Sequence, residues 1–250
     1  MGTFSAVFTV AGTSIWTCPL NVSAVWLTSV GGGSGASRSA GSSNAYNSSG
    51  AGAAEMVCNR LIPVIPDNNY TVTIGAKGMG ATTNLGIPVP PTASSFVGPG
   101  TVYNALGGGA YVNAYDAGNS GNGGGAGGGK GNVSGGGGTK LRREAGRYAG
   151  GAAGNMGSPF PNNGSDSHGG YQSFQQPIIP PPSDTNRVGG GGGATIWGAV
   201  NGGGHNQAGQ NAPATSYGAG GSAGGASDTP SAILAGGNGC DGYVLLIWNE

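Results

Sequence analysis

Residues that could perform catalysis are few and scattered along the 250 residues of this sequence. His168 and His205 lie in separate stretches without a set of Cys, Asp or Glu at metal-ligand spacing, although Asp166 stands close to His168. Neither histidine belongs to a recognisable arrangement with an Asp and a nucleophilic Ser or Cys. The nine carboxylates are dispersed, so no glycosidase pair is apparent. We therefore expect no enzymatic activity, no bound metal and no cofactor.

Phosphate and nucleic-acid binding are also disfavoured. The stretch Gly124–Lys130 matches the opening of a phosphate-binding loop, but Gly131 follows where a Ser or Thr would bind magnesium. Nine basic residues balance nine acidic ones, whereas a nucleic-acid partner requires a concentrated basic surface. The basic cluster Lys140–Arg147 is interpreted as a solvated loop, with contact to an anionic surface such as lipopolysaccharide phosphate as the alternative.

The remaining chemistry is that of binding. Between glycine tracts the sequence is rich in Tyr, Asn, Ser and Gly, with which antibody loops combine aromatic contacts and adaptable hydrogen bonds. We expect recognition chiefly in the inserts Lys140–Tyr148, Met156–Arg187 and His205–Tyr217. The candidate receptor-binding residues are Tyr111, Tyr115, Arg143, Tyr148, Phe160, His168, Tyr171, Trp197 and Tyr217. Alternatively, the aromatic residues among them cover the edges of the packed glycine-rich region or fill contacts between subunits. Tyrosine-rich loops serve protein and glycan receptors alike, so the sequence leaves the receptor class open.

Glycine tracts must hold these inserts in place, because glycine supplies 58 residues and proline 15. The region 98–239 alternates tracts with inserts and shows neither helical periodicity nor the strict Gly-X-Y repeat of collagen. Without side chains, tracts in the polyproline II conformation can lie close enough for their N–H and C=O groups to pair. We predict a packed, rigid slab of such tracts, with flexible linkers as the alternative.

Strand patterns flank this region and predict an all-β fold with little or no helix. We place a β-domain at residues 1–97 plus 240–250 and the glycine-rich region with exposed loops at residues 98–239. The apolar C-terminal strand is expected to dock centrally among the N-terminal strands, which would return the chain to its starting core.

Local patterns refine this expectation. Apolar residues alternate from Phe4 to Val10, which predicts a strand with one well-buried face, and a turn is expected at Ala11–Ser14. A strand pair is expected at Glu55–Ile65 and Tyr70–Ile74, joined by the turn Pro66–Asn69.

The chain shows no sign of membrane insertion or secretion. The longest strongly apolar run, Tyr243–Trp248, is far shorter than the ~20 residues of a transmembrane helix. The N-terminus lacks the basic region of a signal peptide, so we expect assembly in a cytoplasm. Cys18, Cys58 and Cys240 are too few and scattered for a disulfide framework and are expected to be buried thiols.

Several stretches together resemble a known family. These are FTVAGTSIWTCPLNVSAVWLTSVGGGSG near the N-terminus, NYTVTIGAKG, SSF with a short strand into GGG, and the closing GCDGYVLLIW. Their order resembles the glycine-rich domain of many phage tail-fibre and tail-tip proteins, over nearly the whole chain. The alternation of tracts and inserts is similar to the tail-fibre tip adhesins of T-even-like phages, in which stacked polyglycine II helices display receptor-binding loops.

The resemblance implies a virion protein of a tail fibre, assembled in the host cytoplasm, that contacts other fibre proteins and binds a bacterial surface protein or glycan. The alternative is a structural protein without a receptor, such as a fibre connector, head fibre or capsid decoration. Those adhesins carry a separate N-terminal attachment segment, whereas here the β-domain starts at Phe4. The protein either attaches to its fibre through the β-domain or occupies another place on the particle. Its oligomeric state is also open, with a trimer and a single copy on a trimeric fibre as the alternatives.

Overall fold

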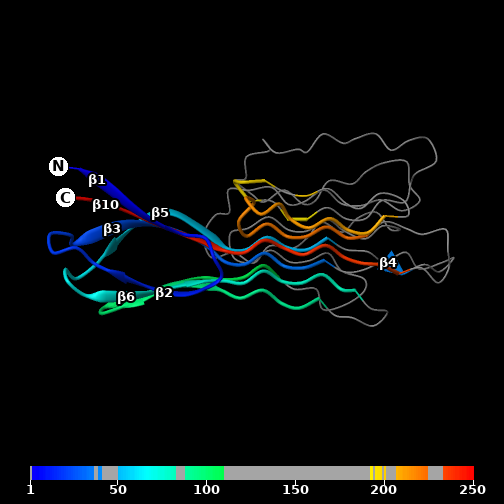
Figure 1. Ribbon diagram of the computed structural model, residues 1–250, viewed down its shortest axis with the longest axis horizontal. Helices are drawn as coiled ribbons and strands as arrows, with labels where there is room; N and C mark the ends of the chain where they lie inside the picture. Colours follow the sequence, from blue (N-terminus) through cyan, green and yellow to red (C-terminus); the bar gives the residue numbers. More distant parts are fainter. Residues whose placement is uncertain are drawn as a thin grey trace.

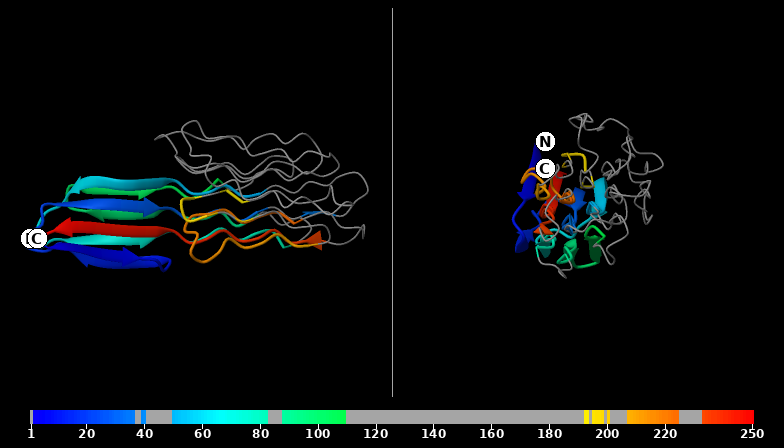
Figure 2. Two further views of the ribbon diagram at one scale, coloured as in Figure 1. Left: turned by 90° about the horizontal axis from the view of Figure 1, so that it is seen from above. Right: turned by 90° about the vertical axis from the view of Figure 1, so that its right-hand side faces the viewer.

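The computed structural model describes residues 2–36, 39–40, 50–82, 88–109, 192–193, 195–198, 200, 207–224 and 233–250. In this part of the chain the regular structure consists of β-strands, which confirms the predicted all-β fold. Among the same residues, no helix has the length and apolar character needed to cross a bilayer. A two-layer β-sandwich forms one end of an elongated molecule, and glycine-rich segments run side by side away from it (Figure 1, Figure 2).

The first layer joins the two ends of the chain in one antiparallel sheet. Its strands, in spatial order, are β1 (Thr3–Phe8), β10 (Tyr243–Asn249), β3 (Ala24–Val30) and β5 (Met56–Pro63). Thr3 lies opposite Asn249, and Phe8 lies opposite Val244. The C-terminal strand therefore sits between two N-terminal strands, as its apolar sequence predicted.

The second layer is also antiparallel and draws on the middle of the described chain. Its strands, in spatial order, are β2 (Gly12–Thr17), β6 (Asn69–Ile74), β7 (Ser94–Gly98) and β8 (Thr101–Ala105). The expected boundary between residues 97 and 98 falls within β7, and β8 lies beyond it. The sandwich thus includes a strand from the range that we assigned to the glycine-rich region.

An apolar core joins the two layers. Leu27 and Leu246 from the first sheet and Tyr70, Val72 and Phe96 from the second are fully buried and belong to one cluster. The rings of Tyr70 and Phe96 stack at 4.9 Å with an interplanar angle of 2°. Burying one such side chain contributes about 1.5–3 kcal/mol, so this cluster is the main source of stability of the sandwich.

Three local expectations were wrong. The chain turns before Gly12, which has φ 133° and already begins β2, so the turn does not occupy Ala11–Ser14. The strands β5 and β6 do not pair, because the turn between them carries the chain from one sheet to the other. Apolar alternation is the same in a hairpin and in such a crossover. Phe4 is 45% exposed because β1 is an edge strand, so the predicted buried face is incomplete.

Beyond the sandwich, extended segments pair through backbone hydrogen bonds with a period of three residues. Segment 235–242 donates to segment 75–82 in this way. The bonds run from Gly242 to Gly75 (2.8 Å), from Gly239 to Gly78 (3.0 Å) and from Gly236 to Ala81 (2.9 Å). A β-strand presents its groups with period two, whereas a polyproline II helix has three residues per turn. These segments therefore form a polyglycine II array.

Segment 31–36 lies at the centre of this array. Its backbone groups bond to six other described segments, namely 50–55, 75–82, 88–93, 106–109, 218–224 and 235–242. A rod in close hexagonal packing also has six neighbours. The tracts therefore satisfy one another's backbone groups in place of water, which offsets part of the entropy lost on ordering glycine.

Close contact in the array depends on the missing side chains. A Cβ on Gly33 would collide with the carbonyl oxygen of Ala219, and one on Gly78 would lie 2.6 Å from the backbone nitrogen of Gly35. Four of the seven segments, 31–36, 50–55, 75–82 and 88–93, precede residue 98. The array is therefore built partly from the range that we assigned to the β-domain.

The far end of the array is marked by a pair of short strands. β4 (Ser39–Ala40) pairs with β9 (Ile233–Leu234) in antiparallel fashion. In Figure 1 this pair lies at the end of the molecule opposite to both chain termini. The molecule therefore has a sandwich end and an array end, which are chemically different.

Candidate functional site

Two candidate binding residues lie in the described chain, and the fold brings them together. The rings of Trp197 and Tyr217 are 5.4 Å apart at 90°. Tyr243, the first residue of β10, completes a cluster at 5.0 Å from Trp197 and 4.8 Å from Tyr217. Aromatic pairs of this kind each contribute about 0.5–1.5 kcal/mol beyond the area that they bury.

Tight turns hold Trp197 and Tyr217 in this cluster. Thr195 and Gly198 exchange two backbone hydrogen bonds, of 2.9 and 3.1 Å, around Trp197. The Ser216 hydroxyl donates to the carbonyl oxygen of Trp197 at 3.3 Å, which ties the turn to the residue before Tyr217. The turn positions are thus fixed by local hydrogen bonds.

The aromatic cluster lies where the sandwich meets the array. Trp197 and Tyr243 pack on Val30, at the end of β3, and on Ala54 and Met56 at the start of β5. All three rings are partly buried. Burial, and secondarily the neighbouring Tyr217, raises the pKa of Tyr243, so its phenol remains neutral at ordinary pH. The cluster joins the two parts of the molecule and leaves some ring surface exposed.

The other seven candidates lie outside the described residues: Tyr111, Tyr115, Arg143, Tyr148, Phe160, His168 and Tyr171. The inserts Lys140–Tyr148 and Met156–Arg187 lie outside as well. The described residues that flank the long stretch 110–191 are hydrogen-bonded to the array. On one side, Gly108 donates to Gly32 at 2.9 Å, and on the other, Gly193 donates to Ala51 at 2.7 Å. The described residues on both sides of this stretch therefore belong to the array.

Four polar residues that the sequence analysis did not single out bind the array backbone or line its flank. The Asn238 Oδ1 accepts from the Gly80 N–H, and the Asn211 Oδ1 accepts from the Asn238 N–H, both at 2.8 Å. The Asp241 Oδ1 accepts from the N–H of Lys77, the last of the four residues, at 2.8 Å. A usable sequence signal was present, since each is a polar residue beside glycine or alanine. Short polar side chains are common in loops, however, so this signal has low specificity.

Two of the three described thiols, those of Cys18 and Cys240, are buried. Burial is the main cause of the raised pKa of both Cys18 and Cys240, and the Cys240 Sγ–H donates to the Ala214 carbonyl at 3.4 Å. Cys58 lies exposed on β5, so the expectation that all three thiols are buried is wrong. Strand β5 is an edge strand, and its outward positions face solvent. Among the described residues, no three or more His, Cys, Asp or Glu are grouped as metal ligands.

Comparison with known families identifies a match over almost the whole chain. A family model described as a glycine-rich domain covers residues 9–249, from the end of β1 to the end of β10. No curated protein matches the chain. The family match therefore spans both the sandwich and the array.

Proposed function

The chain belongs to the glycine-rich domain family, and from this premise we propose that it is a bacteriophage virion protein, a tail-fibre tip adhesin that recognises a bacterial surface receptor. Its place would be the virion tail fibre, where it is exposed to the outside after assembly in the host cytoplasm. Its partners would be other fibre proteins and a surface protein or glycan of the bacterium.

The observation that carries the proposal is the anchoring of the long candidate stretch in the polyglycine array. Residues 110–191 hold seven of the nine candidates, and the segments before and after them are bonded to Gly32 and Ala51. A rigid base lowers the entropy cost of ordering a binding loop, so affinity can come from a few side chains. Such a scaffold suits a protein that varies its loops to bind different surfaces.

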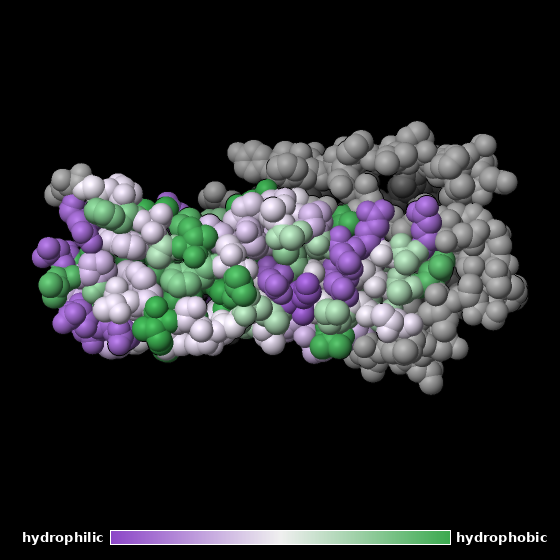
Figure 3. All heavy atoms as spheres, viewed as in Figure 1, coloured by the Kyte–Doolittle hydropathy of each residue, from purple (hydrophilic) through white to green (hydrophobic). Residues whose placement is uncertain are grey.

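The sandwich supports a role in attachment to the rest of the fibre. Trp26, Leu61 and Ile247 are aligned across three neighbouring strands of the first sheet, and Val7 and Leu245 form a second aligned pair. Leu61 and Val7 are 58% and 54% exposed. Apolar rows on the outer face of a sheet are typical of surfaces covered by another protein. Figure 3 shows apolar side chains interspersed with hydrophilic ones on this end and a band of hydrophilic ones across the array.

One observation favours the alternative of a structural protein without a receptor. Trp197 and Tyr217, both candidates for recognition, are engaged in the cluster that joins the sandwich to the array. Aromatic residues between glycine tracts thus can serve the fold. In a connector, head fibre or capsid decoration, all of the aromatic residues between the glycine tracts would stabilise the fold or its contacts and none would bind a receptor.

Two experiments separate these functions. Labelled antibody locates the chain on the particle, and labelling of the capsid would retire the adhesin proposal. Exchange of Met156–Arg187 with the insert of a relative of different host range should change adsorption to host cells. Unchanged host choice after this swap and equivalent swaps of Lys140–Tyr148 and His205–Tyr217 would favour the connector.

A further inference from the structure

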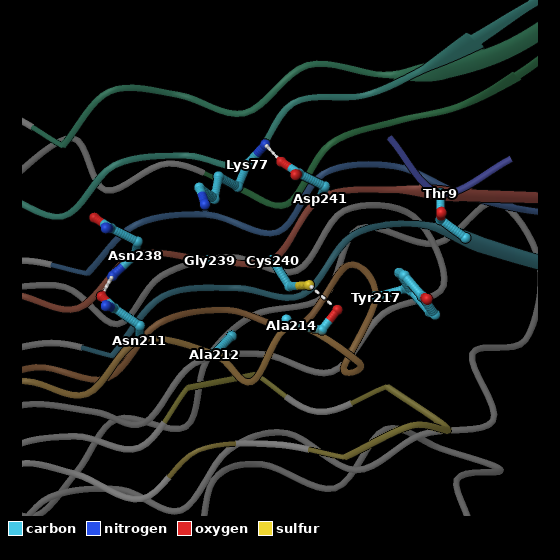
Figure 4. A pocket seen from close by; sticks show the side chains of 10 residues that line it. All are labelled: Thr9, Lys77, Asn211, Ala212, Ala214, Tyr217, Asn238, Gly239, Cys240 and Asp241. Atoms are coloured by element: carbon cyan, nitrogen blue, oxygen red, sulfur yellow. Dashed lines mark hydrogen bonds between the residues drawn. The ribbon is translucent and has the colours of Figure 1, made fainter. Parts of the chain in front are cut away.

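A polar cavity lies on the flank of the array, beside the turn between β1 and β2 (Figure 4). Its volume is about 240 Å³, and its lining comes from segments 75–82, 207–217 and 235–242 together with Thr9. Pockets for drug-sized ligands measure roughly 300–1,000 Å³, so this one suits a smaller molecule. Four of its lining residues, Asn211, Ala212, Ala214 and Tyr217, belong to the insert His205–Tyr217, and none lies in Lys140–Tyr148 or Met156–Arg187.

Three of the lining side chains are held in fixed orientations by the backbone of the array. One oxygen atom of Asn211, of Asn238 and of Asp241 accepts a backbone N–H at 2.8 Å. The second polar atom of each side chain can form a hydrogen bond with a ligand. These atoms are the Nδ2 donors of the two asparagines and the other carboxylate oxygen of Asp241. Lys77 adds an ammonium donor at the same wall (Figure 4). Side chains fixed in this way lose little entropy on binding.

The composition of the walls points to a neutral, hydroxyl-bearing ligand. One basic and one acidic side chain line the cavity, Lys77 and Asp241, so their charges balance and neither an anion nor a cation is favoured. Amide donors beside a carboxylate acceptor match hydroxyl groups, each of which both donates and accepts. Gly239, Ala212 and Ala214 keep the rest of the wall shallow and close to the backbone.

An aromatic ring borders this polar surface. Tyr217 lines the cavity, and its ring is fixed by Trp197 at 5.4 Å and Tyr243 at 4.8 Å. A fixed tyrosine gives a large amphipathic contact surface at low entropy cost. Cys240 contributes no nucleophile, because burial raises its pKa and keeps the thiol protonated.

We propose that this cavity is a binding site for one neutral sugar unit, held by Asn211, Asn238, Lys77 and Asp241 against the Tyr217 ring. This proposal rests on the proposed adhesin function only for the source of the sugar, which would be a unit of a bacterial surface polysaccharide. Because Asn211 and Tyr217 belong to the insert His205–Tyr217, the cavity gives this insert a defined contact with the cell on the flank of the array.

The test is a nuclear magnetic resonance titration of the full chain with methyl glycosides of glucose, galactose, N-acetylglucosamine and rhamnose. At least one glycoside should shift the amides of Lys77, Gly80, Asn238 and Gly239 in a saturable way, and inorganic phosphate should not. The proposal is overturned if no glycoside shifts these amides, or if phosphate shifts them equally.

Matched variants test the assigned contacts. N211D and N238D keep the oxygen that accepts the backbone N–H and remove the Nδ2 donors, so each should weaken binding about three- to tenfold. The exposed Asn104 on β8 provides the control, since N104D makes the same change of charge away from the cavity. K77M extends the test if an aspartate variant fails to fold. Unchanged affinity in the folded pocket variants would overturn the assignment.

A second arm separates the source of the sugar from the site itself. An oligosaccharide released from host surface polysaccharide should bind more tightly than the methyl glycoside of its terminal unit if the polysaccharide is the source; equal binding would overturn that source. Adsorption of the protein to cells is measured in parallel. Adsorption without glycoside binding would refute the sugar site and leave the adhesin function standing. Glycoside binding without adsorption would refute the adhesin function and leave the sugar site standing.

Discussion

The backbone N–H of Gly33 donates to the carbonyl oxygen of Cys240 at 2.8 Å, although 207 positions separate the two residues in the chain. Segment 31–36 leaves the end of β3, and segment 235–242 leads into β10, its neighbour in the sheet. The array thus continues the neighbour relations of the sandwich with a different backbone conformation. The sandwich thereby sets the register from which the glycine segments pair.

Substitution of Gly33 by alanine should destabilise the protein by about 3 kcal/mol, because the added Cβ collides with the Ala219 backbone and segment 31–36 is enclosed by six neighbouring segments. G12A provides the control. A Cβ on Gly12 has nothing within 4 Å and meets only the cost of φ 133°, about 1 kcal/mol. Chemical denaturation measures both. Equal losses would show that close packing of the array contributes little.

Amide exchange should be slow at Gly236, Gly239 and Gly242, whose N–H groups form the three-residue ladder. Exchange requires opening of these bonds, so its rate reports the local free energy of the array. Hydrogen–deuterium exchange read by nuclear magnetic resonance resolves the three amides. Rates equal to those of an unstructured peptide would contradict the array.

Stability should decline at alkaline pH because of Cys240. Burial raises the pKa of this thiol in the folded protein, so below the ordinary thiol pKa, roughly 8–9, its contribution is fully present. As the pH rises through the raised value, the unfolded chain ionises first and that contribution is lost. Denaturation at pH 7 and pH 10 should show a smaller loss for C240A than for the wild type. The exposed Cys58 supplies the control, and a C58A variant that also lost the dependence would refute the assignment.

The sequence predicted the strands well because their signals are local. The apolar run at the C-terminus, which forms β10, carries enough information to predict a strand and to place it centrally. The partners of β5 and β6 were not predictable in this way, since the same turn residues close a hairpin or an inter-sheet crossover. The polyglycine packing followed from composition, but the choice of neighbours depends on contacts between distant segments.

The candidate site was less predictable for a physical reason. Aromatic composition identifies residues able to bind, but it does not distinguish a ring that meets a receptor from one that packs internally, as Trp197 does on Val30 and Ala54. Asn238 and Asp241 were missed because their role depends on backbone groups of segment 75–82, more than 150 positions away.

Incubation of the protein with host polysaccharide should release no oligosaccharide. The dispersed carboxylates of the sequence motivate this expectation, and a substrate-sized carboxylate pair would be needed for hydrolysis by the common mechanism. Chromatography of the products over a day detects even slow cleavage. Release that disappears on substitution of a carboxylate would show that the protein is an enzyme.

Alanine substitution should separate binding aromatics from structural ones. Y148A, F160A and Y171A should each weaken adsorption to host cells by about 1–3 kcal/mol, with little change in the thermal midpoint, because a few aromatic anchors dominate a typical interface. W197A should instead lower the thermal midpoint, since it removes ring contacts at 5.0 and 5.4 Å at the junction of sandwich and array. Tyr217 belongs to both tests. Y217F keeps the ring and should preserve the fold, whereas Y217A should lose both stability and any sugar binding at the flank. Adsorption of folded Y148A, F160A and Y171A at the wild-type level would move recognition away from the inserts and favour the structural connector.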